Sequence, residues 1–134
     1  MATRSTISMQ RSDGSVAQIY CHWDGYPSHN GRILLKHYNR AELVEQLIAL
    51  GDLSSLGDRI GSQHDFDHAP EGECNAYGRD RGESDCEARV YGSYRQIQRV
   101  SYNYLWSDGQ WWLIDRENHL VPLVAVMQEV GAAK

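Results

Sequence analysis

The feature that most restricts the fold of this chain is a Ser-Asp-Gly tripeptide that occurs twice, at residues 12–14 and 107–109. Each copy lies between two segments with the alternating, β-branched or aromatic composition of extended strands, and such tripeptides are typical of tight turns. The strands expected around the two turns are 3–10 with 16–22, and 102–106 with 110–115. The sequence therefore predicts two β-hairpins. Ser-Asp-Gly is common turn chemistry, so the two copies do not establish an internal repeat.

Helical patterns lie between the hairpins and at the end of the chain. Residues 32–38 form one compact helical segment, and in the next Asn39 and Glu42 have the spacing of a capping box. Apolar residues then recur at helical spacing up to the stop at Gly51, namely Leu43, Val44, Leu47, Ile48 and Leu50. Smaller expected elements are helical turns at 53–56 and 94–100, a strand at 89–91 and a last helix from Pro122 to Glu129.

These elements describe a single α+β domain over residues 1–134, with an antiparallel sheet built from two hairpins and helices packed on one face. A chain of 134 residues suits one hydrophobic core. Residues 57–87 are rich in Gly, Asp, Glu, His and Arg and poor in aliphatic residues, so we expect mostly a long loop there. Loops of that length inside a compact domain are usually functional or disordered.

Composition and charge exclude several classes of protein. Apolar residues make up 41% and charged residues 23%, as in soluble globular proteins, and no apolar run approaches the ~18 residues of a membrane span. The first residues lack the apolar core of a secretory signal, which predicts a cytoplasmic protein. The net charge of −5 argues against non-specific binding of duplex DNA.

Residues 20–32, here called the aromatic loop, carry most of the recognition chemistry. On a continuing strand His22 and Asp24 share a face, and Gly25 and Pro27 then bend the chain back. The rings of Trp23 and Tyr26, here called the aromatic shelf, stand beside the expected start of a helix and an arginine. This combination suits a nucleotide, because the rings can stack a base while the cation pairs with phosphate. The candidate ligand-binding residues here are His22, Trp23, Asp24, Tyr26, His29, Asn30 and Arg32. The alternative is a hydrogen-bonded turn whose Trp23 fills the core.

A second candidate cluster lies at residues 77–85. Arg79 and Arg81 stand between two glycines and suit bidentate recognition of phosphate or carboxylate, with Tyr77 as a neighbouring ring. The alternative is a solvated charged turn in which the arginines pair with Asp80 and Glu83.

Metal and nucleophile patterns are weak. His64 and His68 have the spacing of ligands on a helix, but the segment lacks the His-Glu-x-x-His motif and has little helical character. Cys21, Cys74 and Cys86 form no Cys-x-x-Cys pair, which favours free thiols over a zinc site. Cys21 and His22 point apart on a strand. We therefore expect no catalytic residue, no metal and no cofactor.

The tryptophans of the second hairpin predict association. Trp111 and Trp112 lie on opposite faces of a strand, so one faces the core and the other looks outward. Outward tryptophans favour a subunit interface or a pocket wall, which predicts a homo-oligomer.

The motifs Tyr20-Cys-His-Trp-Asp-Gly-Tyr-Pro, Asn30-Gly-Arg-Ile-Leu-Leu, His37-Tyr-Asn, Leu50-Gly-Asp-Leu-Ser-Ser-Leu and Tyr77-Gly-Arg-Asp-Arg-Gly-Glu resemble a family of small uncharacterised proteins encoded by bacteriophages. The resemblance covers about residues 2–90 and brings no established catalytic residues. It implies a phage accessory protein acting in the host cytoplasm, where such proteins often counter host defence.

Taken together, these patterns predict a phage counter-defence protein that binds and sequesters a nucleotide-like host signal without turning it over. The two clusters are expected to fold toward one cavity, shared between subunits. One alternative is an inhibitor that occludes a host defence complex, in the manner of an anti-CRISPR protein, which suits the acidic net charge better. Another is a small phosphoester hydrolase that works through His22 and Asp24.

Overall fold

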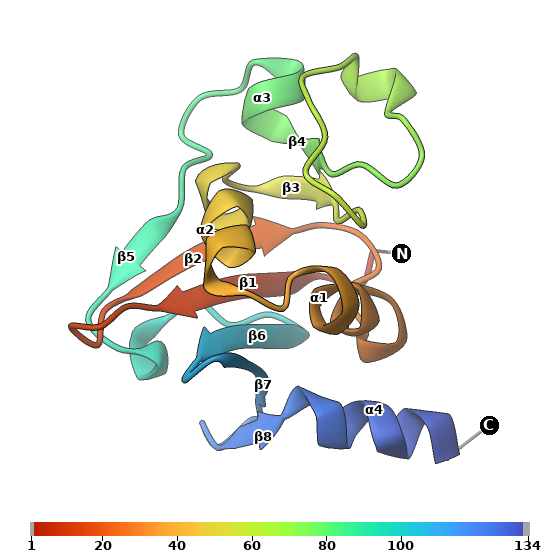
Figure 1. Ribbon diagram of the computed structural model, residues 1–134. Coiled ribbons are helices and arrows are strands. Elements are labelled where there is room, and N and C mark those ends of the chain that lie inside the picture. Colours follow the sequence, from red (N-terminus) through yellow and green to blue (C-terminus); the bar gives the residue numbers. More distant parts are fainter. Residues whose placement is uncertain (1, 133–134) are drawn as a thin grey trace.

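The computed structural model describes residues 2–132 and contains one mixed β-sheet with helices packed against it (Figure 1). The strand order is β4-β3-β2-β1-β6-β7-β8, and β5 pairs with β2 beside this path. The strands are β1 (Ser5–Gln10), β2 (Val16–Cys21), β3 (Leu53–Ser55), β4 (Asn75–Ala76), β5 (Arg89–Tyr91), β6 (Tyr102–Ser107), β7 (Gln110–Ile114) and β8 (Leu120–Pro122). The predicted α+β class is confirmed.

Both predicted hairpins form, as β1–β2 and β6–β7, and each pairs antiparallel. The glycine of each Ser-Asp-Gly turn has a positive φ, +88° at Gly14 and +74° at Gly109, a conformation that disfavours other residues. The sheet is mostly antiparallel, as expected from two hairpins, and it is mixed because β1 pairs parallel with β6 and β2 pairs parallel with β3. Turn chemistry fixes the pairing within a hairpin, whereas packing between distant segments fixes how hairpins join.

Two helical segments cover one face of the sheet. A π-helical turn at Pro27–Gly31 continues into α1 (Arg32–His37), and α2 (Ala41–Ala49) lies across β1 and β2 (Figure 1). The core between them is apolar: Val44 and Leu47 of α2 are fully buried in one cluster with Ile7 and Ile19 of the sheet. The indole of Trp111 joins this core and donates a hydrogen bond to the Tyr38 carbonyl at 2.8 Å.

Three local predictions are wrong. The helix α2 has Arg40 at its N-cap and no side-chain cap, so Asn39 and Glu42 form no capping box. Residues 53–55 are strand β3, because Leu53 pairs with Cys21 at the end of β2. Residues 94–96 form only a 3₁₀ turn. Short apolar runs do not distinguish helix from strand, and here sheet pairing decides.

The opposite face of the sheet carries a second, smaller core. Val16, Ile97, Leu105 and Ile114 are buried there, with Trp112 packed against them. Trp111 and Trp112 therefore lie on opposite faces, as predicted. Trp112 is half-buried and its indole donates to the Ser107 carbonyl, so it is not the outward ring we expected.

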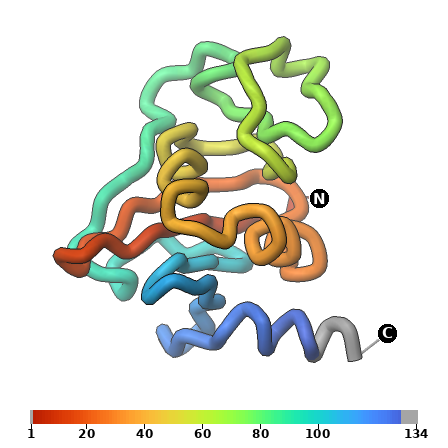
Figure 2. The backbone as a smooth tube through the Cα atoms, in the orientation of Figure 1, coloured from red at the N-terminus to blue at the C-terminus, as the bar shows by residue number. Residues whose placement is uncertain are grey.

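Residues 57–87 are less irregular than predicted. They contain a 3₁₀ turn at Phe66–His68, strand β4 and helix α3 (Tyr77–Arg81). Residues 59–74, here called the 59–74 loop, lie at the end of the sheet formed by β3 and β4, while α4 (Leu123–Ala132) lies at the opposite end (Figure 2). Within residues 2–132, none of the helices combines the length and the apolar character that a bilayer crossing requires.

Candidate functional site

A cleft of about 390 Å³ opens where the aromatic loop meets the end of β3 and the 59–74 loop. We call it the cleft. Its lining comes from three segments: Asp24, His29 and Ile33; Ser55 to Asp58; and Ala69 to Glu73. The aromatic loop reaches this position because backbone pairing continues past β2, with the amides of His22 and Trp23 donating to the carbonyls of Leu53 and Ser54. The aromatic loop therefore meets residues 55–58 and 69–73, which are distant from it in the sequence.

The bend of the aromatic loop is fixed by buried groups. A Cβ at Gly25 would lie 2.7 Å from Ser5 Cβ and 2.8 Å from the Arg4 carbonyl carbon, so only glycine fits. The Tyr104 hydroxyl donates to the Gly25 carbonyl at 2.6 Å. Asn30 is fully buried, and its amide nitrogen lies 3.2 Å from Ser5 Oγ and 3.3 Å from the Trp23 carbonyl. Asn30, predicted to contact a ligand, thus holds the loop together.

The aromatic shelf lies on the surface. Trp23 is 46% exposed and Tyr26 is 38% exposed, so the alternative in which Trp23 fills the core is wrong. The Tyr26 hydroxyl donates to Asp24 at 3.3 Å, and its ring meets that of His29 edge to face. Trp23 and Tyr26 do not line the cleft themselves, whereas Asp24 and His29 of the same loop do. Tyr26 contacts both of these residues and therefore lies beside the cleft.

His22 and Asp24 are partnered separately. His22 Nδ1 lies 2.8 Å from the Tyr20 hydroxyl, and its ring packs edge to face on Trp23. Among residues 2–132 no hydrogen bond joins the His22 and Asp24 side chains. Burial raises the pKa of the neighbouring Cys21 thiol to about 12, which disfavours the thiolate that a nucleophile needs.

Arg32 lies beside the cleft. With Lys36, His37, Ile33 and Asp58 it lines a small hollow of about 80 Å³, here called the basic hollow. Ile33 and Asp58 also line the cleft, so the two spaces adjoin. Within the described part of the chain neither Arg32 nor Lys36 has an acidic partner at ion-pair distance, whereas His37 faces Asp58 at 3.6 Å.

The second predicted cluster is placed differently from the first. Tyr77, Arg79 and Arg81 lie on α3, and none of them lines the cleft. Arg79 donates to the carbonyls of Ile60 and Cys74, both at 2.9 Å, and to the Asp80 carboxylate. This guanidinium is occupied by the protein's own oxygens, so it holds α3 to the 59–74 loop.

Arg81 completes a surface stack. Its guanidinium carbon lies 4.4 Å from the Phe66 ring centre and 4.9 Å from that of Tyr77, and it pairs with Glu83. The alternative in which the arginines pair with neighbouring acids describes this cluster better than a phosphate site. The two predicted clusters do not meet in the cleft.

Sequence reasoning missed the far wall of the cleft. Asp58, Glu71 and Glu73 make that wall acidic, and Arg59 borders it, with Nη2 donating to the Glu71 carbonyl at 3.0 Å. The Arg59 side chain is 61% exposed, and its Nη2 also lies 3.8 Å from the Glu73 carboxylate. A Gly72 with φ of +81° gives the turn that brings residues 71–73 back to Arg59. The sequence signal for this wall was the charged composition of residues 57–87, but composition does not predict which of these residues contact one another.

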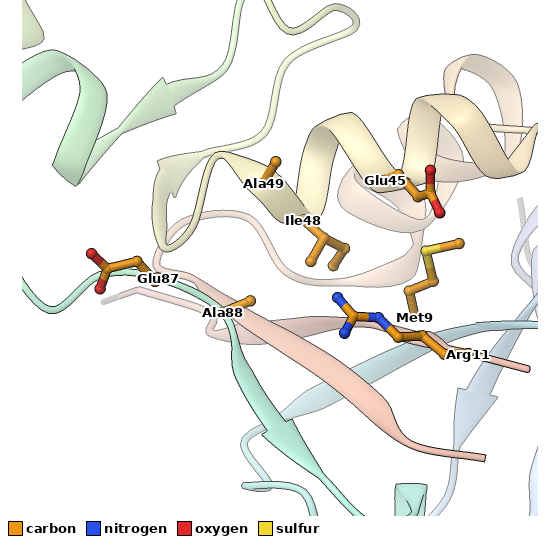
Figure 3. Close-up of a pocket in the computed structure, with 7 residues that line it drawn as sticks. All are labelled: Met9, Arg11, Glu45, Ile48, Ala49, Glu87 and Ala88. Atoms are coloured by element: carbon orange, nitrogen blue, oxygen red, sulfur yellow. The ribbon is translucent and has the colours of Figure 1, made fainter. Parts of the chain in front are cut away.

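A second hollow, here called the α2 pocket, has a volume of about 360 Å³ and lies between α2 and the sheet (Figure 3). Met9, Ile48, Ala49 and Ala88 supply its apolar part, while Arg11, Glu45 and Glu87 supply charge. Figure 3 shows Arg11 reaching in from the sheet side and Glu45 from the helix. None of these residues was a sequence candidate.

Metal ligands do not cluster. Among residues 2–132 no group of three or more His, Cys, Asp or Glu side chains is arranged to hold a metal ion. His68 is exposed and pairs with Asp65, whereas His64 is turned inward. The cysteines are free thiols.

Comparison with known proteins adds no relative: no family model matches the chain, and searches among curated proteins and solved structures give no match. The site must therefore be interpreted from its own geometry.

Proposed function

We propose that this protein binds a small nucleotide-like ligand in the cleft and sequesters it without turning it over. The observation that carries the proposal is a pair of exposed rings, Trp23 and Tyr26, on the loop that supplies Asp24 and His29 to a cleft. This cleft adjoins the unpaired cations Arg32 and Lys36. Exposed aromatic rings stack bases at about 1–3 kcal/mol per base. A nucleotide needs such a surface together with separate sites for sugar and phosphate.

The charges of the site assign the parts of the ligand. Carboxylates accept hydrogen bonds, so Asp24 and Asp58 suit sugar hydroxyls or the N–H groups of a base. They repel phosphate. The phosphate therefore lies at the margins, next to Arg59 on one side or in the basic hollow with Arg32 and Lys36 on the other.

Binding without turnover is supported by the separate partners of the groups that would do chemistry. His22 meets Tyr20, Asp24 meets Tyr26, and the Cys21 thiol is buried. A hydrolase working through His22 and Asp24 would need the two side chains to act on one water.

The biological setting is part of the proposal. The resemblance to bacteriophage proteins supports a counter-defence role, in which a host signalling nucleotide is hidden in the host cytoplasm. The cleft is open on one side, and a second copy of the chain closing over it would bury more of the ligand. This is the reason to propose a homo-oligomer.

A thermal-shift panel of linear and cyclic nucleotides tests the proposal. A true ligand should raise the melting temperature by several degrees and be recovered intact by mass spectrometry. Trp23→Ala and Arg32→Ala should abolish or weaken the shift. Arg95→Ala is the matched control, because Arg95 is an exposed cation that lies over the Tyr94 ring and lines neither the cleft nor the basic hollow. Normal binding by both site variants would place the ligand elsewhere, and product formation would show turnover.

The α2 pocket favours a second candidate, an inhibitor that occludes a host defence complex. Its lining holds two carboxylates, Glu45 and Glu87, against one cation, Arg11, beside apolar residues. This balance suits a basic side chain of a partner protein, and nucleic-acid-binding surfaces are basic. Absence of any nucleotide-induced shift, together with co-purification of a host complex that Glu45→Gln and Glu87→Gln weaken, would favour this candidate.

A further inference from the structure

A further hollow, here called the β7 pocket, has a volume of about 410 Å³ and lies where β6 begins and β7 ends. The antiparallel pairing of these two strands brings the two ends together. The lining comes from residues 99–103 and 113–116. None of these residues lines the cleft, the basic hollow or the α2 pocket, so the β7 pocket is a separate space.

Arg99 is a fixed cation of this pocket. Its Nη1 donates to Asn118 Oδ1 at 2.6 Å, and its Nη2 donates to the carbonyls of Ile114 at 3.2 Å and Asp115 at 2.6 Å. All three acceptors are neutral oxygens, and within residues 2–132 no carboxylate lies at ion-pair distance from this guanidinium. The side chain is therefore held in place while its positive charge stays uncompensated, unlike both guanidiniums of α3, which are paired with carboxylates.

The second cation of the pocket has no contact to give up. Arg116 is exposed, and in the described part of the chain its side chain makes neither a hydrogen bond nor an ion pair. The carboxylate of Asp115, which also lines the pocket, is occupied by its own turn. Its Oδ1 accepts from the amides of Glu117 at 2.9 Å and His119 at 2.8 Å, and its Oδ2 lies 3.3 Å from His119 Nδ1. Neither guanidinium of the lining is thus neutralised by this acid.

The polar groups of the lining suit a phosphate group. Arg99, Arg116 and the hydroxyl of Ser101 are all donors, and a phosphate presents several strong acceptor oxygens to them. The surrounding chain has the matching charge, because residues 89–116 contain four arginines and two aspartates in a protein whose net charge is −5. The acidic wall of the cleft has the opposite character.

The apolar groups of the lining suit a body attached to that phosphate. Tyr102 and Leu113 lie on neighbouring strands and are half-buried, so each still presents part of its apolar surface. Pockets for small molecules combine such surface with a few convergent polar groups. Bare inorganic phosphate would leave this part of the β7 pocket unused.

We propose that the β7 pocket is a second binding site, for a small organic phosphate whose phosphate group lies between Arg99 and Arg116 and whose apolar body packs on Tyr102 and Leu113. The site goes beyond the proposed function and does not depend on it, because the β7 pocket and the cleft share no residue.

Titration of the intact protein with phenyl phosphate, followed by amide NMR, tests the site. Saturable shifts should appear at residues 99–103 and 113–116. Arg116→Gln should weaken the affinity about tenfold, as expected for a lost hydrogen bond between charged groups, and should leave Tm unchanged. Arg95→Gln is the matched control, because it removes the same charge from an exposed arginine outside the pocket. Equal weakening by the two variants, or shifts without saturation, would indicate an adventitious ion only and overturn the proposal.

Two further probes test the class of ligand. Inorganic phosphate should bind more weakly than phenyl phosphate, because it has no apolar body. Benzoate should also bind more weakly, because a carboxylate carries less charge and fewer acceptor oxygens. Equal affinity for phenyl phosphate and either probe would overturn the assigned class.

The nucleotide panel separates this site from the cleft. If phenyl phosphate binds as described and no nucleotide binds in the cleft, the β7 site stands and only the proposed function fails. If a nucleotide binds in a manner that depends on Trp23 and Arg32, and phenyl phosphate gives no saturable shift at residues 99–116, the proposed function stands and only the β7 site fails.

Discussion

The hairpin half of the molecule and the segment from Arg59 to Arg81 are held together by different forces. Around the hairpins, aliphatic and aromatic side chains are fully buried, among them Ile7, Leu47 and Trp111. From Arg59 to Arg81 the inward side chains are mostly polar: His64, Asn75, Arg79 and Asp80. The stability of the first region depends on the burial of apolar surface, which has no preferred direction. The stability of the second depends on hydrogen bonds, which need a defined geometry and change when a partner gains or loses charge. The cleft lies at their boundary.

The largest expected effect concerns the apolar half. Leu47→Ala removes a fully buried side chain between α2 and the sheet and should lower the free energy of unfolding by about 2–5 kcal/mol. Urea denaturation measures this value. The cost should appear in one cooperative transition that includes the 59–81 segment, because that segment is anchored on β3. A loss below about 1 kcal/mol would show that α2 does not cover the core.

The polar half should respond locally. Asp80→Asn removes the charge that Arg79 and His64 face, and it replaces an acceptor oxygen by a donor NH₂ group. The substitution should lower the free energy of unfolding by about 2–3 kcal/mol. Hydrogen exchange should place most of the increased opening in residues 59–81, with little change at β1 and β6. The control is Asp67→Asn, an exposed acid on the same loop. Equal loss of protection throughout the sheet would contradict the division into two regions.

Acid should weaken the polar half before the apolar half. The pKa of Asp80 is lowered in the folded state, so the stability it contributes is present above the unfolded value of about 4 and is lost as the pH falls below it. Exchange of the 59–81 segment, measured from about pH 5 downward, should rise earlier in wild type than in Asp80→Asn. The effect should be smaller than that of the substitution. Coincident profiles of the two proteins would assign the acid sensitivity to another group.

The smallest effect concerns the link between β5 and the end of β2. Arg89 donates two hydrogen bonds of 2.9 Å to Asp52, whose Oδ1 also accepts from the Tyr20 amide. Arg89→Lys keeps the charge and loses the bidentate geometry, which in this partly exposed pair should cost about 0.5–1 kcal/mol. Thermal unfolding measures it, and Arg95→Lys is the control. A loss equal to that of Asp80→Asn would show that β5 belongs to the polar network.

Local sequence patterns predicted the hairpins, helix α2 and the opposite faces of Trp111 and Trp112, because turn residues and side-chain periodicity act within a few residues. Strand β3 was predicted as a helical turn, since its structure depends on pairing with β2. At the site, the sequence identified the aromatic loop but not the wall opposite, which forms only when Gly72 meets Arg59. Asn30 and Arg79 have the chemistry of ligand-binding residues, and only the fold shows that buried protein groups occupy them.

The absence of space at Gly25 has a consequence for how this protein can diverge. Position 25 touches the chain near its beginning, at Arg4 and Ser5, and its amide donates to the Thr3 carbonyl. A side chain there would push the first strand away from the loop that carries Trp23. Homologous sequences should therefore keep glycine at this position whichever side chains stand at positions 4 and 5, because the close contacts are with the backbone of Arg4 and the Cβ of Ser5. An affinity tag is accordingly better placed at the carboxyl end than directly before Thr3.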